Sequence, residues 1–355
     1  EYTSFHLSHS IYSFNRCHAG YGVHHAYVNK RNGKVDAMEQ VKLGNTGLEV
    51  GVAGLGSGGS SRLGQGYGLP KADSVKVIKA ALDMGITFFD TAAVYKTEKI
   101  VGEGLLGQRQ NVVISTKAQI IKPGSPALGN DMAPPSQIRE GLESSLKKLQ
   151  TDYVDIFHLH GVMPNQYGYC VEHLVPELIK MREEGKIRHI GITERFITDT
   201  DHTMLSKAVA DDFWDVVMIG LNFLNPSARK SLFPSTHKKG IATLIMFAVR
   251  TALSRTSVLK ELLQEMADNK LIDQTIASEP EPLKFLTDPG IAESIMDAAY
   301  RFCRFEPGTE VILTGTGNVD HLRQNVASIC APILPSETLI HLEAIFGHVD
   351  TVSGN

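Results

Sequence analysis

Short continuous runs of apolar residues alternate along this chain with longer stretches in which apolar residues recur at helical spacing. The runs predict buried strands, because a parallel strand that is covered on both faces is apolar throughout its length. Ahead of them, residues 41–43 and 48–50 flank the turn Gly44-Asn-Thr-Gly47, which is typical of a β-hairpin. The predicted strands are residues 52–56, 86–89, 112–115, 154–159, 189–192, 216–219, 242–246 and 311–313.

Each predicted strand is followed by a stretch of helical spacing. The first of these runs from the expected N-cap Asp73 to Gly85, and the third begins at the expected N-cap Ser136. Eight strand–helix units favour an α/β fold, a closed (β/α)8 TIM barrel preceded by a β-hairpin, over an open sheet. The predicted helices are residues 73–85, 97–106, 136–149, 171–184, 201–209, 227–238, 291–304 and 319–328.

Two connections are longer than such a barrel needs. Residues 161–170 are rich in Tyr, Asn and Gly, and residues 251–289 are charged and contain a helical pattern over 258–266. Both follow strands, so we expect them as long loops at the C-terminal mouth of the barrel, where they would shape a substrate site.

The composition excludes several classes of protein. With 42% hydrophobic residues and a net charge of −4 over 355 residues, the chain is too apolar to be disordered and too acidic to favour nucleic acid. No apolar run approaches the ~20 residues of a membrane helix, so we expect neither nucleic-acid nor membrane partners. The four cysteines show no CxxC spacing, which argues against a zinc site or a disulfide framework and predicts a reducing, cytoplasmic compartment.

The first 37 residues differ from the rest of the chain. They contain five histidines but show no helical or strand periodicity. A histidine-rich segment can bind a metal, whereas the missing periodicity favours an unstructured extension. We therefore expect residues 1–37 to be an extension and residues 38–355 to form a single barrel domain with loop insertions.

Ionisable side chains stand where the predicted strands end. Asp90 follows the second strand and Tyr95 lies in the same loop, while Lys117 and His160 follow the third and fourth strands. Because the carboxyl ends of barrel strands meet at one mouth, we expect these four side chains to converge. Each one alone would be an ordinary loop, cap or core residue. Together they predict a catalytic site, and no metal site is predicted.

The four side chains fit one kind of chemistry. A free phenol has a pKa of ~10, too high to donate a proton readily near neutral pH. The ammonium group of Lys117 is expected to lower the pKa of Tyr95, and Asp90 would hold that lysine. His160 could orient a carbonyl oxygen of the substrate. Such a set suits protonation of an oxygen while a hydride arrives at the carbon.

With these residues in place, the sequence resembles the aldo-keto reductase family. The segments that carry the resemblance are Phe89-Asp-Thr-Ala-Ala-Val-Tyr-Lys-Thr-Glu98, Ile114-Ser-Thr-Lys117, Tyr153-Val-Asp-Ile-Phe-His-Leu-His160 and Gly185-Lys-Ile-Arg-His-Ile-Gly-Ile192. The resemblance implies a catalytic tetrad of Asp90, Tyr95, Lys117 and His160 with Tyr95 as the acid. It also implies an NAD(P)H-dependent enzyme that interconverts a carbonyl (aldehyde, ketone or sugar) and an alcohol.

The same resemblance implies where the adenosine half of a nucleotide would bind. A glycine loop enters a helix after the last strand, and helix N-termini favour phosphate. The cofactor is expected to be NADP or NAD, with NADPH favoured by the resemblance. Members that prefer NADPH usually carry Lys or Arg where this chain has Gly315 and His321. The residues implied for this half are Gly315, Thr316, Gly317, Asn318, His321, Gln324 and Asn325.

The expected nicotinamide pocket departs from the family pattern. The pair Thr193-Glu194 replaces a Ser-Asn pair that binds the carboxamide, and Glu194 could accept a hydrogen bond from the carboxamide nitrogen. Met218 replaces a glutamine, and Met246 followed by Phe247 replaces the tyrosine on which the ring stacks. A methionine sulfur gives a softer platform for a ring.

Two further features complete the expected cofactor site. Arg250 lies just beyond the stacking position and could face the pyrophosphate. Residues 54–59 fit the G-x-G-x-x-G dinucleotide fingerprint, but no helix opens directly after them, so a Rossmann interpretation is rejected. Within a barrel, Gly56 and Ser57 are instead expected at the mouth after the first strand.

Two other functions stay open at this point. The altered nicotinamide pocket fits a non-catalytic barrel that senses a cofactor or binds a partner, which would bind cofactor tightly without turnover. The glycine loop after the last strand also fits a lyase or isomerase that handles a phosphorylated substrate, which would need no nicotinamide cofactor.

Overall fold

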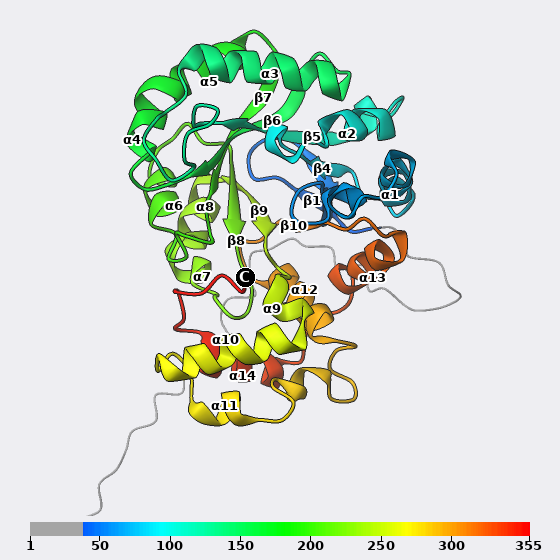
Figure 1. Ribbon diagram of the computed structural model, residues 1–355, viewed down its shortest axis with the longest axis vertical. Helices are drawn as coiled ribbons and strands as arrows, with labels where there is room; N and C mark the ends of the chain where they lie inside the picture. Colours follow the sequence, from blue (N-terminus) through cyan, green and yellow to red (C-terminus); the bar gives the residue numbers. More distant parts are fainter. Residues whose placement is uncertain (1–37) are drawn as a thin grey trace, which may run out of the picture.

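The computed structural model describes residues 38–355, and a closed barrel of parallel strands forms their centre (Figure 1). The expectations for residues 1–37 lie outside this part of the chain. Neighbouring strands follow one another in sequence, and β10 pairs with β3 to close the ring. The predicted TIM barrel is therefore confirmed. Its strands are β3 (Ala53–Gly56), β4 (Phe88–Asp90), β5 (Val113–Gln119), β6 (Val154–Val162), β7 (Ile187–Glu194), β8 (Val216–Gly220), β9 (Ala242–Met246) and β10 (Val311–Thr314).

The predicted hairpin is also present, as β1 (Gln40–Lys42) paired antiparallel with β2 (Glu49–Gly51). Leu43 and Val50 from this hairpin are fully buried. They pack into an apolar cluster with barrel residues such as Phe88 and Ile156. The hairpin thus covers the apolar interior at the end where the strands begin, which leaves the opposite end as the mouth.

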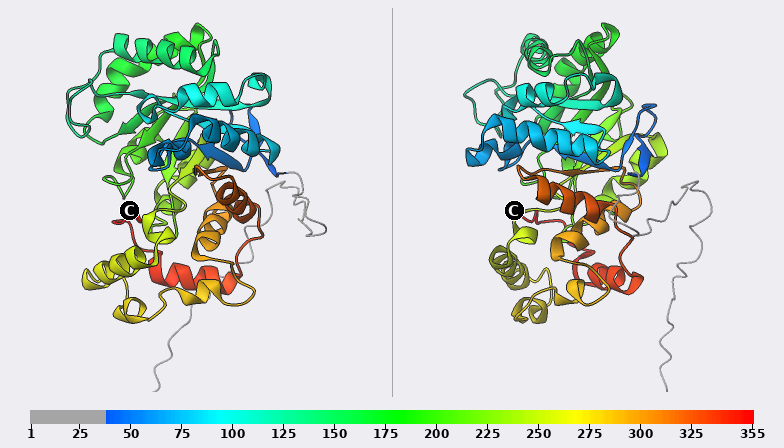
Figure 2. Two further views of the ribbon diagram at one scale, coloured as in Figure 1. Left: turned by 45° about the vertical axis from the view of Figure 1, so that its right-hand side comes forward. Right: turned by 90° about the vertical axis from the view of Figure 1, so that its right-hand side faces the viewer.

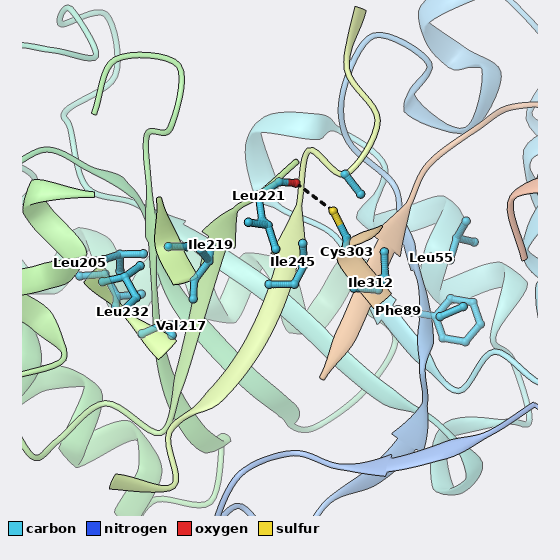
Figure 3. Close-up of a cluster of buried hydrophobic side chains, with 14 of the residues drawn as sticks. Leu55, Phe89, Leu205, Val217, Ile219, Leu221, Leu232, Ile245, Cys303 and Ile312 are labelled. Atoms are coloured by element: carbon cyan, nitrogen blue, oxygen red, sulfur yellow. Dashed lines mark hydrogen bonds between the residues drawn. The ribbon is translucent and has the colours of Figure 1, made fainter. Parts of the chain in front are cut away.

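A larger apolar cluster separates the barrel from its helices (Figure 3). Every second side chain of a strand points into the interior of the barrel. The side chains between them, such as Val217 and Ile219 on β8, point outwards into this layer and pack with Leu205 and Leu232. Both faces of each strand are therefore buried, which explains the continuous apolar runs in the sequence.

Helices surround the barrel, and most of them lie where the sequence predicts (Figure 1). The α-helices are α1 (Lys71–Asp83), α2 (Glu98–Gly104), α3 (Pro135–Leu149), α4 (Tyr167–Tyr169), α5 (Val175–Glu183), α6 (Thr203–Ala208), α7 (Ala228–Ser231), α8 (Phe233–Lys239), α9 (Thr251–Ser254), α10 (Thr256–Asp268), α11 (Gln274–Ser278), α12 (Ile295–Phe305), α13 (Val319–Ile329) and α14 (Ser336–Phe346). The 3-10 helices are η1 (Arg62–Tyr67), η2 (Ala93–Tyr95), η3 (Arg109–Asn111) and η5 (Lys284–Thr287), and η4 (Cys170–Leu174) is a π-helix between α4 and α5.

Proline explains where the predicted helix boundaries were wrong. The expected N-caps Asp73 and Ser136 lie inside α1 and α3, which follow the N-caps Pro70 and Pro134 instead. A proline at the start of a helix has no amide hydrogen to leave unsatisfied. The helix predicted over 227–238 is split in two at Leu232, because Pro234 cannot donate the hydrogen bond that would continue it.

The long loop 251–289 and the end of the chain fold together beside the barrel. In Figure 2 the yellow-to-red helices, including α10, α11 and α14, form the lower part of the molecule. The rings of Phe285 and His341 lie 4.2 Å apart, and His348 Nε2 lies 2.8 Å from the carbonyl oxygen of Leu271. Helix α14 was not predicted. In the described part of the chain, no helix is long and apolar enough to cross a membrane.

Gly191 on β7 has a packing role that can be tested. A Cβ at this position would lie 2.2 Å from Nδ1 of His158, a fully buried residue on β6. Gly191→Ala is therefore expected to lower the free energy of unfolding by about 1–3 kcal/mol, the usual cost of overpacking a core. Thermal or urea unfolding measures this change.

Gly141 provides a matched control for that substitution. It lies in α3, and a Cβ there would meet nothing within 4 Å. Gly141→Ala is expected to stabilise the protein by roughly 0.5–1 kcal/mol, because alanine favours the helix interior. Equal effects of the two substitutions would mean that His158 does not need the space at Gly191.

Candidate active site

A buried ion pair lies at the carboxyl ends of two neighbouring strands. Lys117 on β5 places its Nζ 2.6 Å and 2.5 Å from the two carboxylate oxygens of Asp90 at the end of β4. The ammonium group also donates to the carbonyl oxygen of Thr91 at 2.8 Å, and Ser115 donates to Asp90 at 2.9 Å. Asp90 is 4% exposed and Lys117 1% exposed, so both groups depend on these partners.

Tyr95 lies against this pair from the turn η2 that follows β4. Its ring centroid is 5.0 Å from Nζ of Lys117, and its hydroxyl is 3.3 Å from Nε2 of His160 on β6. Gly58 supports the ring from the loop after β3, since a Cβ there would lie 2.6 Å from Cε2 of Tyr95. The structure therefore brings together all four residues of the expected catalytic set.

The electrostatics of Tyr95 correct one expectation. Burial raises the pKa of the phenol above its ordinary value, and although the Lys117 ammonium lowers this pKa, it does not offset the burial. Burial also raises the pKa of Asp90, against the opposing effect of Lys117. For Lys117 itself, burial would lower the pKa, but Asp90 and Tyr95 raise it above its ordinary value. In the protein without ligand, Tyr95 is therefore a protonated phenol held beside a charged lysine.

The two histidines of β6 are neutral. Burial, with added repulsion from Lys117 and Arg195, lowers the pKa of His160 to about 3. The pKa of His158 is also far below its ordinary value, mainly because this residue is completely buried. A neutral imidazole at His160 can share a hydrogen bond with the Tyr95 hydroxyl and with a substrate oxygen.

On the adenosine side, the expected glycine loop lies beside β3. A Cβ on Gly315 would lie 2.9 Å from the carbonyl oxygen of Gly56, and one on Gly317 would lie 2.4 Å from Cα of Gly64. Asn318 caps α13 by accepting the amides of Asp320 and His321. The loop thus ends at the N-terminus of a full helix, where backbone amides and the dipole favour an anion.

The other residues expected on this side differ in exposure. Gly315, Asn318, His321 and Gln324 are exposed, and Asn325 is partly buried. The side chain of Asn325 donates to Oγ1 of Thr314 at 2.9 Å. Thr316 is largely buried, and its hydroxyl oxygen accepts the amide of Asn318 at 3.1 Å.

On the nicotinamide side, several expected residues are held by contacts within the fold. Ser57 is buried, with its hydroxyl 2.8 Å from that of Thr97, and Oγ1 of Thr193 accepts the amide of Gly161 at 2.7 Å. Met218 is buried in the interior cluster of the barrel, and Met246 packs against the same cluster.

Arg250 and Phe247 form a stacked pair after β9. The guanidinium carbon of Arg250 lies 4.0 Å from the ring centroid of Phe247, and its buried Nε has no hydrogen-bond partner among the described residues. Burial lowers the pKa of Arg250. Residues 352–355 hold this loop, since Ala252 donates its amide to Gly354 at 3.1 Å and Arg250 bonds the side chain of Asn355.

The geometry does not support Glu194 as a carboxamide ligand. Its carboxylate oxygens lie 2.9 Å and 3.0 Å from Nδ1 of His202, and one of them accepts the amide of Gly220 at 2.7 Å. Successive residues of a strand point to opposite faces, so Glu194 faces away from the side of Thr193. The residue is 3% exposed and is used by the fold.

Two residues at the mouth were not singled out from the sequence. Gly58 belongs to the fingerprint whose Rossmann interpretation the closed barrel excludes, and its small size instead admits the Tyr95 ring. Arg195 follows β7, and the alternation that places Thr193 on the inner face also predicts Arg195 there.

Across residues 38–355, no cluster of three or more His, Cys, Asp or Glu side chains could hold a metal ion.

Known proteins resemble this chain in sequence over most of its length. The aldo/keto reductase family matches residues 54–345. L-galactose dehydrogenase of Arabidopsis thaliana is 28% identical over 333 residues, which cover 89% of this chain and 97% of that protein. Aldo-keto reductase YhdN of Bacillus subtilis (strain 168) is 28% identical over 291 residues, which cover 78% of this chain and 85% of that protein.

Solved structures support the fold. The aldo-keto reductase AKR11C1 from Bacillus halodurans, in its holo form, superposes with a TM-score of 0.63 over 86% of this chain and 96% of its own. The sequences are 20% identical in that alignment, so the likeness concerns the fold alone. The superposition therefore supports the barrel fold of this chain.

Proposed function

This chain belongs to the aldo/keto reductase family, and we propose that it interconverts a carbonyl and an alcohol with Tyr95 as the proton donor. The family supports an NAD(P)-dependent oxidoreductase with a small-molecule substrate. The observation that carries the assignment of Tyr95 is its position, with the hydroxyl 3.3 Å from His160 and the ring 5.0 Å from the Lys117 ammonium.

The four expected catalytic residues at the mouth have different roles in proton transfer. A carbonyl oxygen placed between Tyr95 and His160 would receive the phenolic proton as negative charge develops on it. Lys117 stabilises the phenolate that remains, and Asp90 holds the ammonium in place through both of its oxygens. A bound nicotinamide cofactor supplies the hydride for the carbon.

The residues present fit a nicotinamide dinucleotide. The glycine loop from Gly315 to Asn318 leads into α13, and the N-terminus of a helix favours a phosphate. Arg250 lies in the loop after β9, the strand that pairs with β10, and its Nε has no hydrogen-bond partner among residues 38–355. We propose that these residues, with His321, Gln324 and Asn325 on α13, hold the nucleotide, and that NADPH is preferred as the family resemblance implies.

The substrate is proposed to be an aldehyde, a ketone or a sugar. A sugar is included because one relative with nearly full-length coverage is named L-galactose dehydrogenase. The loop expected over 161–170 is shorter in the structure, because β6 extends to Val162 and helix starts at Tyr167. Residues 163–166 and the segment 251–289 after β9 both leave the mouth end of the barrel, where they can contact such a substrate.

Cofactor titration followed by a substrate panel tests the proposal. NADPH and NADH are titrated separately while the fluorescence of the reduced nicotinamide is followed, and the complex is then offered aldehydes, ketones and sugars. We expect binding in the micromolar range or tighter, as is usual for such enzymes, with oxidation of the cofactor by a carbonyl. Tight binding with no turnover would support the non-catalytic barrel instead. Conversion of a phosphorylated substrate without nicotinamide would support the lyase or isomerase.

The pH profile of carbonyl reduction should be flat through the physiological range. Tyr95 must be protonated to act as an acid, and its raised pKa keeps it protonated below about pH 10. His160, with a pKa near 3, does not titrate in that range. We therefore expect kcat/KM to stay constant between about pH 6 and pH 9 and to fall only at higher pH. Loss of activity with a midpoint near pH 7 would contradict this assignment.

A further inference from the structure

Arg195 lies beside the candidate active site. It is the first residue after β7, and its Nε is 3.9 Å from the position that a Cβ would take on Gly161. Gly161, with a φ of +63°, directly follows His160, and its amide donates to Thr193. The Nε of Arg195 therefore lies near the residue that directly follows His160.

The positive charge of Arg195 has no counterpart in the described part of the chain. The side chain forms no ion pair there, and its buried Nε has no hydrogen-bond partner. A buried N–H donor without an acceptor is unfavourable, and the guanidinium group carries four further N–H donors that can bind an incoming acceptor. The arrangement indicates that an acceptor is supplied by something that binds at the mouth.

Nearby acids are already used by other groups. Asp90 is paired with Lys117, Glu194 is paired with His202, and the carboxylate of Asp199 accepts the amide of Met204 at 2.9 Å. Lys117 is neutralised by Asp90, so it does not compete for an incoming anion. Arg195 is thus an uncompensated cation near the Lys117–Asp90 pair, whose two charges balance each other.

The charge of Arg195 is close enough to influence His160. Its repulsion contributes, after burial and Lys117, to the low pKa of His160. An anion bound to Arg195 would therefore lie within electrostatic reach of the oxygen that Tyr95 protonates.

We propose that Arg195 selects carbonyl substrates that carry a carboxylate. This inference rests on the proposed function and names the substrate class of the same site. A planar guanidinium matches a carboxylate through two parallel hydrogen bonds. One guanidinium balances the single charge of a carboxylate, whereas a phosphate monoester carries almost two charges at neutral pH and would keep one unmatched.

The test compares 4-carboxybenzaldehyde with benzaldehyde, which lacks the carboxylate group, in the presence of NADPH. The wild-type protein is expected to prefer the carboxylated aldehyde. Arg195→Gln should lower kcat/KM for that aldehyde by about 10- to 100-fold, the effect of losing a charged hydrogen-bond pair. Turnover of benzaldehyde should change by less than about threefold, because no charged contact is lost there. Arg195→Lys should restore part of the preference.

Lys99→Gln provides the matched control. Lys99 is exposed on α2, and its replacement removes the same charge away from Arg195. We expect no change in the ratio of the two kcat/KM values. An equal loss of that ratio in Lys99→Gln and Arg195→Gln would assign the preference to net charge and overturn the proposal.

Binding measurements separate this inference from the proposed function. Benzoate is titrated into the NADPH-bound protein, and binding is followed by the fluorescence of the nicotinamide. Binding that is lost in Arg195→Gln supports the proposal even if neither aldehyde is turned over, a result that would count against the proposed function alone. Weaker binding of NADPH itself in Arg195→Gln, with equal losses for both aldehydes, would make Arg195 a cofactor contact and overturn the proposal.

Discussion

Replacement of Tyr95 by phenylalanine is expected to lower kcat for carbonyl reduction by about 10²- to 10⁴-fold, the contribution that general acid catalysis usually makes. The substitution removes a single oxygen, so the ring keeps its contacts with Gly58 and the Lys117 ammonium. The hydrogen bond with His160 is lost, together with the proton that the carbonyl oxygen needs. Steady-state kinetics with NADPH and a carbonyl substrate measures the effect.

Two measurements show whether this loss is chemical. The dissociation constant for NADPH should be unchanged in Tyr95→Phe, because no residue expected to hold the nucleotide is altered. Tyr67→Phe serves as the control, since Tyr67 is an exposed tyrosine of η1 whose hydroxyl contacts only Ser60 among the described residues. That control should keep full activity, and full activity in Tyr95→Phe would exclude Tyr95 as the acid.

Replacement of Asp90 by asparagine is expected to lower the free energy of unfolding by about 3–5 kcal/mol and to abolish turnover, because it leaves a buried ammonium group without its counter-charge. Lys117 is 1% exposed and has no second carboxylate among its contacts. Without Asp90, burial would lower the pKa of Lys117, and the lysine would no longer stabilise a phenolate at Tyr95. Urea unfolding and activity at a fixed pH measure the two effects.

A second variant distinguishes charge from packing at this pair. Asp90→Asn combined with Lys117→Met removes both charges, and we expect it to recover most of the stability while staying inactive. The exposed pair Lys122–Asp131 offers a surface comparison, because Asp131→Asn should leave the unfolding midpoint almost unchanged. An Asp90→Asn protein that unfolds at the same urea concentration as the wild type would show that the buried pair does not stabilise the fold.

The proximity of the four expected catalytic residues was predictable, because the topology of a barrel relates position in the sequence to position in space. Asp90, Lys117 and His160 each follow a recognisable apolar run, and the ends of consecutive parallel strands must be neighbours. Tyr95 lies five residues after Asp90, close enough in the chain to stay at the same mouth. Each of these inferences needs only the order of strands and the direction in which they run.

The details that were missed depend on which way a side chain points or on contacts distant in sequence. Glu194 was expected in the nicotinamide pocket because its neighbour Thr193 was, but alternation along β7 turns it towards His202. The same alternation places Arg195 on the inner face with Thr193, and the sequence analysis did not apply it to this residue. The net rise in the pKa of Tyr95 could not be read from residue types, since it depends on how deeply the phenol is buried. Helix α14 packs against residues 251–289, and the sequence pattern did not predict how that segment folds.

The close approach of Gly315 to β3 limits how the nucleotide preference of this enzyme can be redesigned. Members of the family that prefer NADPH usually place a basic residue at this position, but any side chain here would meet the carbonyl oxygen of Gly56 at 2.9 Å. That oxygen belongs to the backbone and cannot rotate away, so a lysine at 315 would have to move the end of a barrel strand. His321 has no such constraint, because it is exposed on α13. A basic side chain that binds a ribose phosphate can therefore be introduced at position 321, whereas the backbone of β3 leaves no room for one at position 315.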